Sequence, residues 1–357
     1  MPRIVIAAGG TAGHVVPALA VAEALRERGA EVEFVGGERA EAELVPAAGY
    51  ELHRLRVSGI DRRNVLRGAG ALLLAGRATA QARGLLRRIG ADAVMGGGGY
   101  VAGPVGLAAR SLRLPLVLTE ADSHLGVTNR LLAPLAQRVF LAFPIEGRSG
   151  DKWELVGRPV PAATGRVDRS AARERFGIGP DESCVLVFGG SLGARLLNHA
   201  ALDAFGSAAP GVVLHASGHR DHPELRERLD ALGSPPHYHL YPYVLPFADV
   251  LAAADLVVGR AGGSVMEVAA AGLPSILVPY PHASADHQTL NARYMERAGA
   301  AVVVADHELD GPRLAREVGA LLAAPQRMAT MAKAARAVAK PGAAQRIADE
   351  LLALAQR

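Results

Sequence analysis

Three glycine-rich segments of this sequence have the residue types that hold a phosphate group. They are residues 9–14 (GGTAGH), 96–100 (GGGGY) and 189–194 (GGSLGA), and each follows a short apolar run. Small residues let backbone N–H groups approach phosphate oxygens, and the positive end of a following helix favours the negative charge. Each segment therefore predicts main-chain contacts with an anionic ligand. A tight strand–helix turn without a ligand is the alternative for each.

The three segments differ in how specific they are. No Gly-Lys-Ser/Thr follows residues 9–14, and their spacing is not that of a dinucleotide fingerprint. The four consecutive glycines at 96–99 are more specific, because they cost backbone entropy and offer nothing to pack. In the third segment, Ser191 either adds a hydroxyl to a diphosphate cradle or caps the helix that follows.

Residues 259–291 carry polar side chains of the kind that bind a sugar nucleotide. Glu267 lies among small residues, where a carboxylate has little packing value but can accept hydrogen bonds from two vicinal ribose hydroxyls. Asp286, Gln288 and Asn291 add groups that match sugar hydroxyls. A capped helix with solvent-facing polar residues explains any one of these four residues, but it explains the whole set poorly.

The elements that position these residues alternate between apolar runs and helical stretches. In the first half we expect a helix at residues 17–28 and strands at 3–8, 31–35, 91–95, 116–119 and 138–142. In the second half we expect a last helix at 343–357 and strands at 184–188, 255–258, 275–278 and 300–304. This alternation predicts parallel sheets with helices on both faces.

The two halves of the chain begin alike, and the turn-prone connector Gly157-Arg158-Pro159-Val160-Pro161 separates them. We therefore expect an α/β fold of two doubly wound, Rossmann-like domains that face a cleft, with the boundary after residue 158. Ligands of such sheets bind at the carboxyl ends of the strands. The glycine-rich segments lie at those ends.

Composition excludes several classes of function. The chain has 357 residues, half of them hydrophobic and 21% charged, which is typical of about two globular domains. Only 4% of the residues are aromatic, so stacking platforms are scarce and we expect no nucleic-acid partner. Cys184 is the one cysteine, which excludes an internal disulfide and a cysteine-rich zinc site. Because the first apolar run is too short for a signal-peptide core, we expect a cytoplasmic protein.

The charge pattern is compatible with an anionic membrane surface. The net charge is +4, and no apolar stretch approaches the ~20 residues of a membrane span. Residues 62–88 interleave six leucines with seven arginines, which suits a peripheral site on anionic lipid. An ordinary packed helix with a solvated face explains the leucines equally well.

Together these residues resemble the GT-B nucleotide-sugar glycosyltransferases, and more closely the bacterial lipid-linked N-acetylglucosaminyltransferases of peptidoglycan synthesis. The resemblance extends over essentially the full length. The motifs that carry it are GGTAGHVVP at 9–17, GGGGYVAGP at 96–104, Glu120 with Thr128-Asn129, GGSLGA at 189–194, RAGG with Glu267 at 260–267, AAAGLPSILVPYPH at 269–282 and DHQTLNA at 286–292.

This resemblance implies transfer of N-acetylglucosamine (GlcNAc) from UDP-GlcNAc to the C4 hydroxyl of undecaprenyl-diphosphate-linked N-acetylmuramyl pentapeptide. The enzyme would act as a peripheral protein on the cytoplasmic face of the cell membrane. The two N-terminal glycine segments, including Gly98, Gly99 and Tyr100, would face the acceptor pyrophosphate. The last helix, 343–357, would pack back onto the N-terminal domain, which leaves 159–342 as the UDP-GlcNAc-binding domain.

The resemblance also implies a set of donor contacts. They are Thr11, Ala12 and Gly13 near the donor sugar, Ser191 at the diphosphate, the backbone of Val244 at the uracil, Gly262, Gly263 and Ser264 beside Glu267 at the ribose, and Gln288 with Asn291 at the GlcNAc hydroxyls.

At three places the sequence departs from the pattern of these transferases. Ala12 replaces a glycine, so a positive φ there would be costly. Asp122 replaces an asparagine and cannot donate a hydrogen bond when ionised. At the connector the pattern Gly-Asn-Pro-Val-Arg places an arginine near uracil, where this chain has Pro161. Arg158 is the candidate replacement for that contact.

The implied reaction is a direct displacement at the anomeric carbon with inversion. His14 is the leading general base, because it lies on a loop that faces the cleft and titrates near neutrality. A contact with phosphate or with the loop backbone is its alternative role, and Glu120 and Asp122 are the other candidate bases. Arg260 has either a leaving-group role or a structural one. Because the chain has no Asp-x-Asp motif, we expect no cofactor and no protein-bound metal, with main-chain amides holding the diphosphate.

Other functions remain open from the residues alone. The nearest is another GT-B transferase, or a nucleotide-sugar epimerase, with a different substrate; a second phosphate cradle argues against a neutral acceptor. A dinucleotide-dependent oxidoreductase predicts one cofactor fingerprint and not two similar domains. A non-catalytic sugar-nucleotide-binding protein has no need for both His14 and Glu267.

Overall fold

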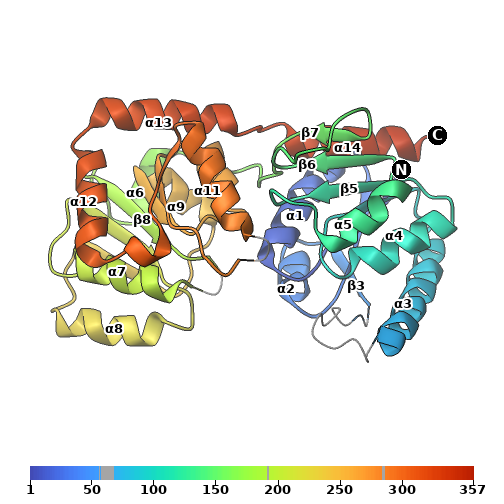
Figure 1. Ribbon diagram of the computed structural model, residues 1–357, viewed down its shortest axis with the longest axis horizontal. Helices are drawn as coiled ribbons and strands as arrows, with labels where there is room; N and C mark the ends of the chain where they lie inside the picture. The colour runs from blue at the N-terminus through green and yellow to red at the C-terminus, as the bar shows by residue number, and fades with distance from the viewer. Residues whose placement is uncertain (56, 58–67, 191–192, 284–285) are drawn as a thin grey trace. The chain divides into compact units, whose positions relative to one another are not determined.

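The computed structural model describes residues 1–55, 57, 68–190, 193–283 and 286–357, and only the backbone course of 68–75. The chain forms two compact units (Figure 1). Unit 1 contains Met1–Pro161 and Pro341–Arg357, and unit 2 contains Ala162–Lys340. The division falls three residues beyond the boundary expected after residue 158.

Unit 1 is built on a seven-stranded, wholly parallel sheet with strand order β3-β2-β1-β4-β5-β6-β7. Its strands are β1 (Arg3–Ala7), β2 (Glu31–Gly36), β3 (Glu51–Arg54), β4 (Ala93–Gly96), β5 (Leu116–Glu120), β6 (Arg138–Leu141) and β7 (Trp153–Leu155). Its α-helices are α1 (Ala12–Glu27), α2 (Ala40–Ala47), α3 (Gly68–Ile89), α4 (Ala102–Ser111), α5 (Val127–Leu132) and α14 (Ala343–Ala355). The five expected strands are confirmed, and the edge strands β3 and β7 were not expected.

Strand β1 shows why the strands of this sheet have continuous apolar sequences. Ile4 and Ile6 pack into a core with α1 and α14, while Val5 and Ala7 pack into a second core with α3 and α4. All four are at most 1% exposed. A parallel strand that is covered on both faces has no polar side, so alternation is lost from its sequence.

The last helix, α14, completes unit 1. Ile347 and Leu351 are 0% exposed and lie in the same core as α1. Figure 1 shows α14, in red, beside the other elements of unit 1. On its other side, Arg346 pairs with Glu154 of β7 at 2.7 Å and with Glu350 at 3.0 Å. Apolar burial and this ion-pair cluster therefore hold a segment that the chain reaches only after unit 2.

Unit 2 repeats the design with a six-stranded parallel sheet, in the order β10-β9-β8-β11-β12-β13. Its strands are β8 (Cys184–Phe188), β9 (Val212–Ala216), β10 (Tyr238–Tyr241), β11 (Leu256–Gly259), β12 (Ser275–Leu277) and β13 (Ala301–Val303). Its α-helices are α6 (Arg169–Arg175), α7 (Arg195–Phe205), α8 (His222–Ala231), α9 (Phe247–Ala253), α10 (Val265–Ala270), α11 (His287–Arg297), α12 (Gly311–Leu322) and α13 (Pro325–Val338). The four expected strands are confirmed, and β9 and β10 were missed.

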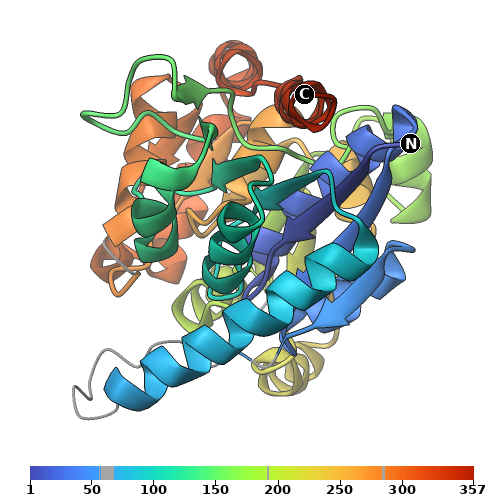
Figure 2. The ribbon, with the colours of Figure 1, turned by 90° about the vertical axis from the view of Figure 1, so that its right-hand side faces the viewer.

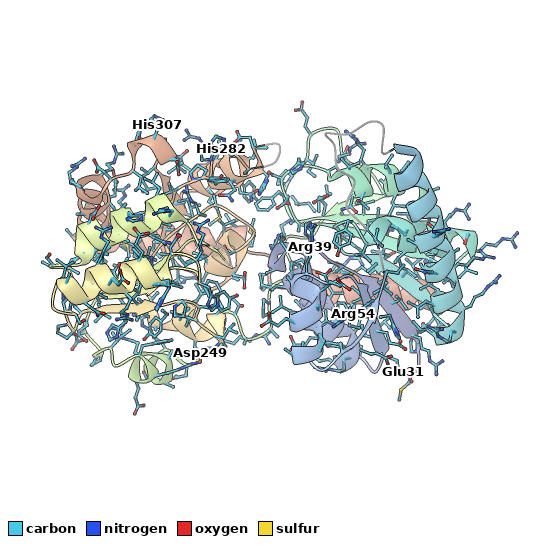
Figure 3. The ribbon with its side chains drawn as sticks, turned by 90° about the horizontal axis from the view of Figure 1, so that it is seen from below. Glu31, Arg39, Arg54, Asp249, His282 and His307 are labelled. Atoms are coloured by element: carbon cyan, nitrogen blue, oxygen red, sulfur yellow. The ribbon has the colours of Figure 1, made fainter. Side chains whose placement is uncertain are left out.

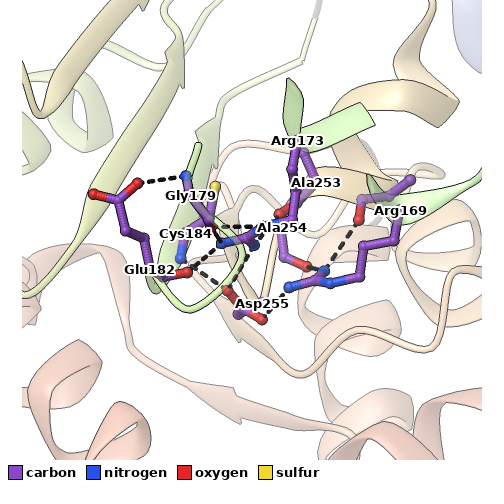
Figure 4. Close-up of polar contacts among 9 residues, drawn as sticks. Arg169, Arg173, Gly179, Glu182, Cys184, Ala253, Ala254 and Asp255 are labelled. Carbon is purple, nitrogen blue, oxygen red and sulfur yellow. Dashed lines mark hydrogen bonds and ion pairs between the residues drawn. The ribbon is translucent and has the colours of Figure 1, made fainter. Parts of the chain in front are cut away.

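Ionic contacts fix the amino end of the second sheet. The Asp255 carboxylate accepts a hydrogen bond from the Cys184 N–H at 2.9 Å and one from Arg169 at 2.6 Å (Figure 4). Arg173, which is buried, adds a contact to Asp255 at 3.4 Å. Burial also raises the pKa of the Cys184 thiol to about 12, so this cysteine stays protonated. The starts of β8 and β11 are thereby joined, and their carboxyl ends remain for a ligand.

For helix α3 the sequence left two interpretations open, an apolar face with basic flanks on lipid or an ordinary packed helix. Leu85 and Leu86 lie in the core against the sheet, with exposures of 8% and 1%, which supports the packed helix for these two leucines. Arg77, Arg87 and Arg88 are exposed along this helix, which Figure 2 shows in the foreground. Arginines 62, 63 and 67 lie outside the described residues. Among the described helices, none is long and apolar enough to cross a membrane.

We predict that Ile347→Ala lowers the free energy of unfolding of unit 1 by about 2–5 kcal/mol, because it opens a cavity against α1. The one tryptophan, Trp153, lies in unit 1, so its fluorescence during urea unfolding measures this unit. Leu314→Ala, at an equally buried position of unit 2, should leave the tryptophan transition in place. An unchanged midpoint in the Ile347 variant would contradict the prediction.

Candidate functional site

Each sheet has a point where the strand order reverses, and the glycine segments flank that point. In unit 1 the reversal lies between β1 and β4, where Ala7 pairs with Gly96 at the carboxyl ends. In unit 2 it lies between β8 and β11, where Phe188 pairs with Gly259. Open α/β sheets bind ligands in the crevice at this point. Each unit therefore has its own candidate binding site, built from segments that the sequence singled out.

The first glycine segment is shorter than expected, because α1 begins at Ala12 and not at residue 17. Thr11 is the N-cap in an extended conformation, and His14 lies in the first helical turn. The residue with positive φ in this turn is Gly10, at 112°, so the cost expected for Ala12 does not arise. The first N–H groups of a helix have no intrahelical partner, which makes this turn suitable for an anion.

The His14 ring is held between two loops. Its Nδ1 lies 3.4 Å from the Thr11 hydroxyl oxygen. A Cβ atom added to Gly98 would lie 2.6 Å from His14 Cδ2, and one added to Gly99 would lie 1.9 Å from the Gly9 carbonyl oxygen. Both glycines also have positive φ, at 89° and 79°. The glycines at 98 and 99 are therefore required so that the loop after β4 can lie against the start of α1.

Sequence reasoning missed Glu41 of α2, which joins the loops after β1, β2 and β4. It is 0% exposed, and its carboxylate accepts hydrogen bonds from Gly10 N–H at 2.8 Å, Gly37 N–H at 2.9 Å and Tyr100 Oη at 3.0 Å. Burial opposes ionisation, but these donors outweigh it and hold the pKa of Glu41 below its ordinary value of 4.5. Arg39 lies over the Tyr100 ring at 5.2 Å (labelled in Figure 3). Tyr100 is thus part of the wall of the loop.

Glu120, a candidate base, lies at the end of β5 and is 5% exposed. Its carboxylate accepts hydrogen bonds from Gly126 N–H at 2.8 Å, Asn129 Nδ2 at 3.0 Å and Asp122 N–H at 3.2 Å. Burial raises its pKa, and these three donors oppose that shift. Because the donors fix both oxygens, the geometry favours a role in shaping the loop that presents Asp122 over a role as the base.

Arg158 makes two hydrogen bonds within unit 1. It is 6% exposed, and its guanidinium donates to the carbonyl oxygens of Gly13 at 2.5 Å and Ala121 at 2.8 Å. These contacts place it behind the two loops that carry His14 and Asp122.

In unit 2, the loop after β8 leaves its central residues undescribed, and the expected ligand residue Ser191 is one of them. Gly190 and Gly193 have positive φ, and a Cβ added to Gly193 would lie 2.4 Å from the Ser217 carbonyl oxygen. That carbonyl accepts a hydrogen bond from Asn198 Nδ2 at 2.8 Å. Asn198 also contacts His215, whose pKa burial lowers to about 3, so this histidine is neutral. Asn198 Nδ2 also donates to the buried Asp221 carboxylate at 2.9 Å, so a buried polar network that includes one carboxylate supports the loop.

The loop after β11 places the expected ribose residue in a helix start. Gly262, Gly263 and Ser264 lead into α10, and Glu267 is its third residue. A Cβ atom added to Gly262 would meet no atom of the described residues within 4 Å, so among them this stretch of main chain is uncovered. Val244, in the segment between β10 and α9, buries its side chain in the core beside Phe188.

Two expected sugar residues contact the protein itself. Asn291 is 0% exposed, and its Nδ2 donates to the Ala261 carbonyl oxygen at 3.1 Å. Gln288 Oε1 accepts a hydrogen bond from the Tyr280 N–H at 2.9 Å.

Arg260, 8% exposed, pairs with Asp306 and donates to the Val278 carbonyl oxygen at 3.1 Å. For Arg260 these contacts support the structural role.

One group of described side chains has the spacing of metal ligands. Glu33, Glu51 and His53 offer atoms within 4.8 Å of one another. They lie on the paired strands β2 and β3 and belong to neither glycine loop.

Comparison with known proteins identifies two family domains in the chain. Residues 4–141 match the glycosyltransferase family 28 N-terminal domain, and residues 184–347 match the C-terminal domain of that family. A protein of Moorella thermoacetica is 43% identical over 98% of both chains, and one of Alkalilimnicola ehrlichii is 46% identical over 97% of both. Both are named UDP-N-acetylglucosamine–N-acetylmuramyl-(pentapeptide) pyrophosphoryl-undecaprenol N-acetylglucosamine transferase.

Solved structures extend the comparison. The crystal structure of Acinetobacter baumannii MurG has a TM-score of 0.76 at 30% identity, over 98% of this chain and 99% of that one. A UDP-GlcNAc 2-epimerase from Neisseria meningitidis, bound to UDP-GlcNAc, has a TM-score of 0.68 at 14% identity, over 98% of this chain and 100% of that one. The second likeness shows a shared fold alone. The expected GT-B fold is confirmed.

We predict that Glu41→Gln lowers the free energy of unfolding at pH 7 by about 1–3 kcal/mol, because glutamine cannot replace both acceptor oxygens. Since the folded pKa lies below 4.5, the stabilisation by the ionised Glu41 is complete above pH 4.5 and is lost as the pH falls through the folded pKa. The difference between wild type and variant should therefore shrink below pH 4.5. Urea unfolding followed by Trp153 fluorescence measures it. Glu43→Gln, at an exposed position of the same helix, is the control. If the difference in free energy of unfolding between wild type and Glu41→Gln stays constant as the pH falls, the role of ionised Glu41 is refuted.

Proposed function

Since this chain belongs to glycosyltransferase family 28, we propose that it transfers GlcNAc from UDP-GlcNAc to lipid-linked N-acetylmuramyl pentapeptide on pyrophosphoryl-undecaprenol. The names of relatives that match it over nearly their whole length support these substrates. One observation carries the proposal: each of the two sheets presents a glycine loop at its reversal point. Donor and acceptor each contain a diphosphate, so the reaction needs two such cradles.

Unit 1 is the proposed acceptor unit. The first turn of α1, with Thr11, Ala12 and Gly13, offers N–H groups to the acceptor pyrophosphate, and its outer residues approach the donor sugar. Gly98 and Gly99 admit no side chain, because His14 and the Gly9 carbonyl group fill that space, and the loop after β4 therefore borders the same cradle. Tyr100, braced by Glu41, closes the side of this cradle.

Unit 2 is the proposed donor unit. The loop that contains Ser191 and the main chain at Gly262 and Gly263 hold the UDP diphosphate. Glu267 accepts hydrogen bonds from the ribose hydroxyls, and the backbone at Val244 meets the uracil. Gln288 faces the GlcNAc hydroxyls, while Asn291 acts from behind by holding Ala261 at the base of the loop.

The acceptor C4 oxygen attacks the anomeric carbon, and the bond from that carbon to the UDP oxygen breaks. The hydroxyl proton passes to His14, and the charge that develops on the diphosphate is met by main-chain N–H groups. Glu120 shapes the loop that carries Asp122, which is the alternative base. The enzyme acts at the cytoplasmic face of the membrane, where the exposed arginines of α3 attract anionic lipid.

The proposal predicts that UDP release from UDP-GlcNAc depends on the lipid-linked muramyl acceptor. Coupled detection of UDP, with and without acceptor, measures this. Release without acceptor, or formation of an epimerised sugar nucleotide, would overturn the assignment and favour the epimerase alternative. Release with a neutral lipid acceptor at the same rate would overturn the acceptor class.

We further predict that His14→Ala lowers kcat by about 10²–10⁴-fold at saturating acceptor, while the Kd for UDP changes little, because unit 2 holds the nucleotide. The acid limb of the kcat/KM profile should disappear, since protonated imidazole is the inactive form. Asp122→Asn is the matched comparison and should retain that limb. If kcat is unchanged in the His14→Ala variant and only the KM for the acceptor rises, His14 binds the acceptor phosphate and is not the base. The base is then assigned to Asp122.

A further inference from the structure

Helix α1 contains a proline at a position where a hydrogen bond is lost. Pro17 is the sixth residue of the helix, well beyond its first turn. Proline has no N–H, and its ring also pushes away the carbonyl four residues earlier. That carbonyl belongs to Gly13, directly before His14. The proline therefore deprives the active-site turn of one of the bonds that would fix its geometry.

Arg158 supplies the missing donor from 145 residues away. Its Nη2 lies 2.5 Å from the Gly13 carbonyl oxygen, and its Nη1 lies 2.8 Å from the Ala121 carbonyl oxygen. The side chain is buried and comes from the connector that follows β7, between Gly157, whose φ is 88°, and Pro159. One planar guanidinium thus holds two carbonyl groups at a fixed separation, which the point charge of a lysine cannot do.

The two carbonyls belong to the two segments that carry the candidate bases. Gly13 precedes His14, and Ala121 lies between Glu120 and Asp122. These segments follow β1 and β5, which are not neighbours in the sheet, since β4 lies between them. No ladder hydrogen bond joins β1 to β5, so Arg158 provides a direct link between their loops.

The charge of Arg158 is also placed against the usual preference of a helix. The amino end of a helix carries a partial positive charge, so a cation there costs stability. The same cation raises the positive potential that an acceptor pyrophosphate would meet at the first turn of α1. This location therefore serves anion binding better than it serves folding.

We propose that Arg158 is a positioning residue that replaces the helix hydrogen bond removed by Pro17, and so holds the His14 turn in register with the Glu120–Asp122 segment. Arg158 acts through main-chain carbonyls and touches neither substrate. The proposal rests on the proposed function for its kinetic readout, and it replaces the uracil contact considered for this residue.

A double-mutant cycle on Pro17 and Arg158 tests this role. Arg158→Met should lower kcat roughly 10–100-fold at saturating acceptor, with an unchanged Kd for UDP, because the base is displaced while unit 2 is intact. Pro17→Ala should have near wild-type kcat. In the Pro17→Ala background, the fold-loss of kcat caused by Arg158→Met should be at most about a third of the fold-loss in the wild-type background. The reason is that the alanine introduced at position 17 has an N–H that can bond to the Gly13 carbonyl oxygen. Rescue by a backbone N–H distinguishes positioning from a substrate contact.

The control is Arg138→Met, which removes an arginine that pairs with Glu350 at the opposite, amino end of the same sheet. Its effect should be the same with and without the Pro17→Ala change. Equal loss of kcat on Arg158→Met in both backgrounds would overturn the proposal, and so would a raised Kd for UDP.

Stability measurements keep the test independent of the acceptor. The same four proteins are unfolded in urea with Trp153 fluorescence as the probe, and the cost of Arg158→Met should be smaller in the Pro17→Ala background. If wild type releases no UDP with the lipid acceptor, the proposed function fails, yet this cycle still reports whether Arg158 and Pro17 are coupled. Additive effects of the two substitutions on the free energy of unfolding would overturn the coupling between Arg158 and Pro17. If the methionine variant does not fold, Arg158→Lys takes its place in the same cycle.

Discussion

The loops of unit 1 depend on one buried carboxylate and the N–H groups that converge on it. Glu41 binds Gly10 and Gly37, and it also receives the Tyr100 hydroxyl. The loops that follow adjacent parallel strands are not held by sheet hydrogen bonds or by helix packing. They are rich in glycine, so they bury little apolar side-chain surface. A charged acceptor that binds three donors supplies that order from behind, and the front of the loops keeps its own N–H groups for a ligand.

The shared fold and the local chemistry of the loops point to the same sites, but they carry different information. Structures of sugar-nucleotide epimerases share this fold at 14–16% identity, so the architecture alone does not select a reaction. The features that bear on the proposed reaction are local: a histidine in the first turn of α1, a second glycine loop against it, and a carboxylate that shapes the loop after β5. Each of these lies in unit 1.

The sequence predicted the buried strands and the glycine loops because continuous apolar runs and glycine clusters are each typical of few structures. It did not predict the role of Glu41, because no sequence pattern distinguishes that residue from Glu43 two positions later. Only the folded structure shows that Glu41 is buried and Glu43 is exposed. The start of α1 was placed too late because a proline is commonest in a first turn, and here Pro17 lies deeper, while Arg158 donates to the Gly13 carbonyl oxygen. Edge strand β10 was missed because Tyr238 and His239 interrupt the apolar pattern.

The return of α14 to unit 1 has a consequence for synthesis. Residues 162–340 form one continuous unit, which can fold as soon as it leaves the ribosome. Unit 1 is synthesised first but lacks part of its core until Pro341–Arg357 emerge, since Ile347 and Leu351 complete it. Unit 1, although translated first, is thus the last to finish folding. Until those residues emerge, the surface of α1 that α14 covers stays open to chaperones.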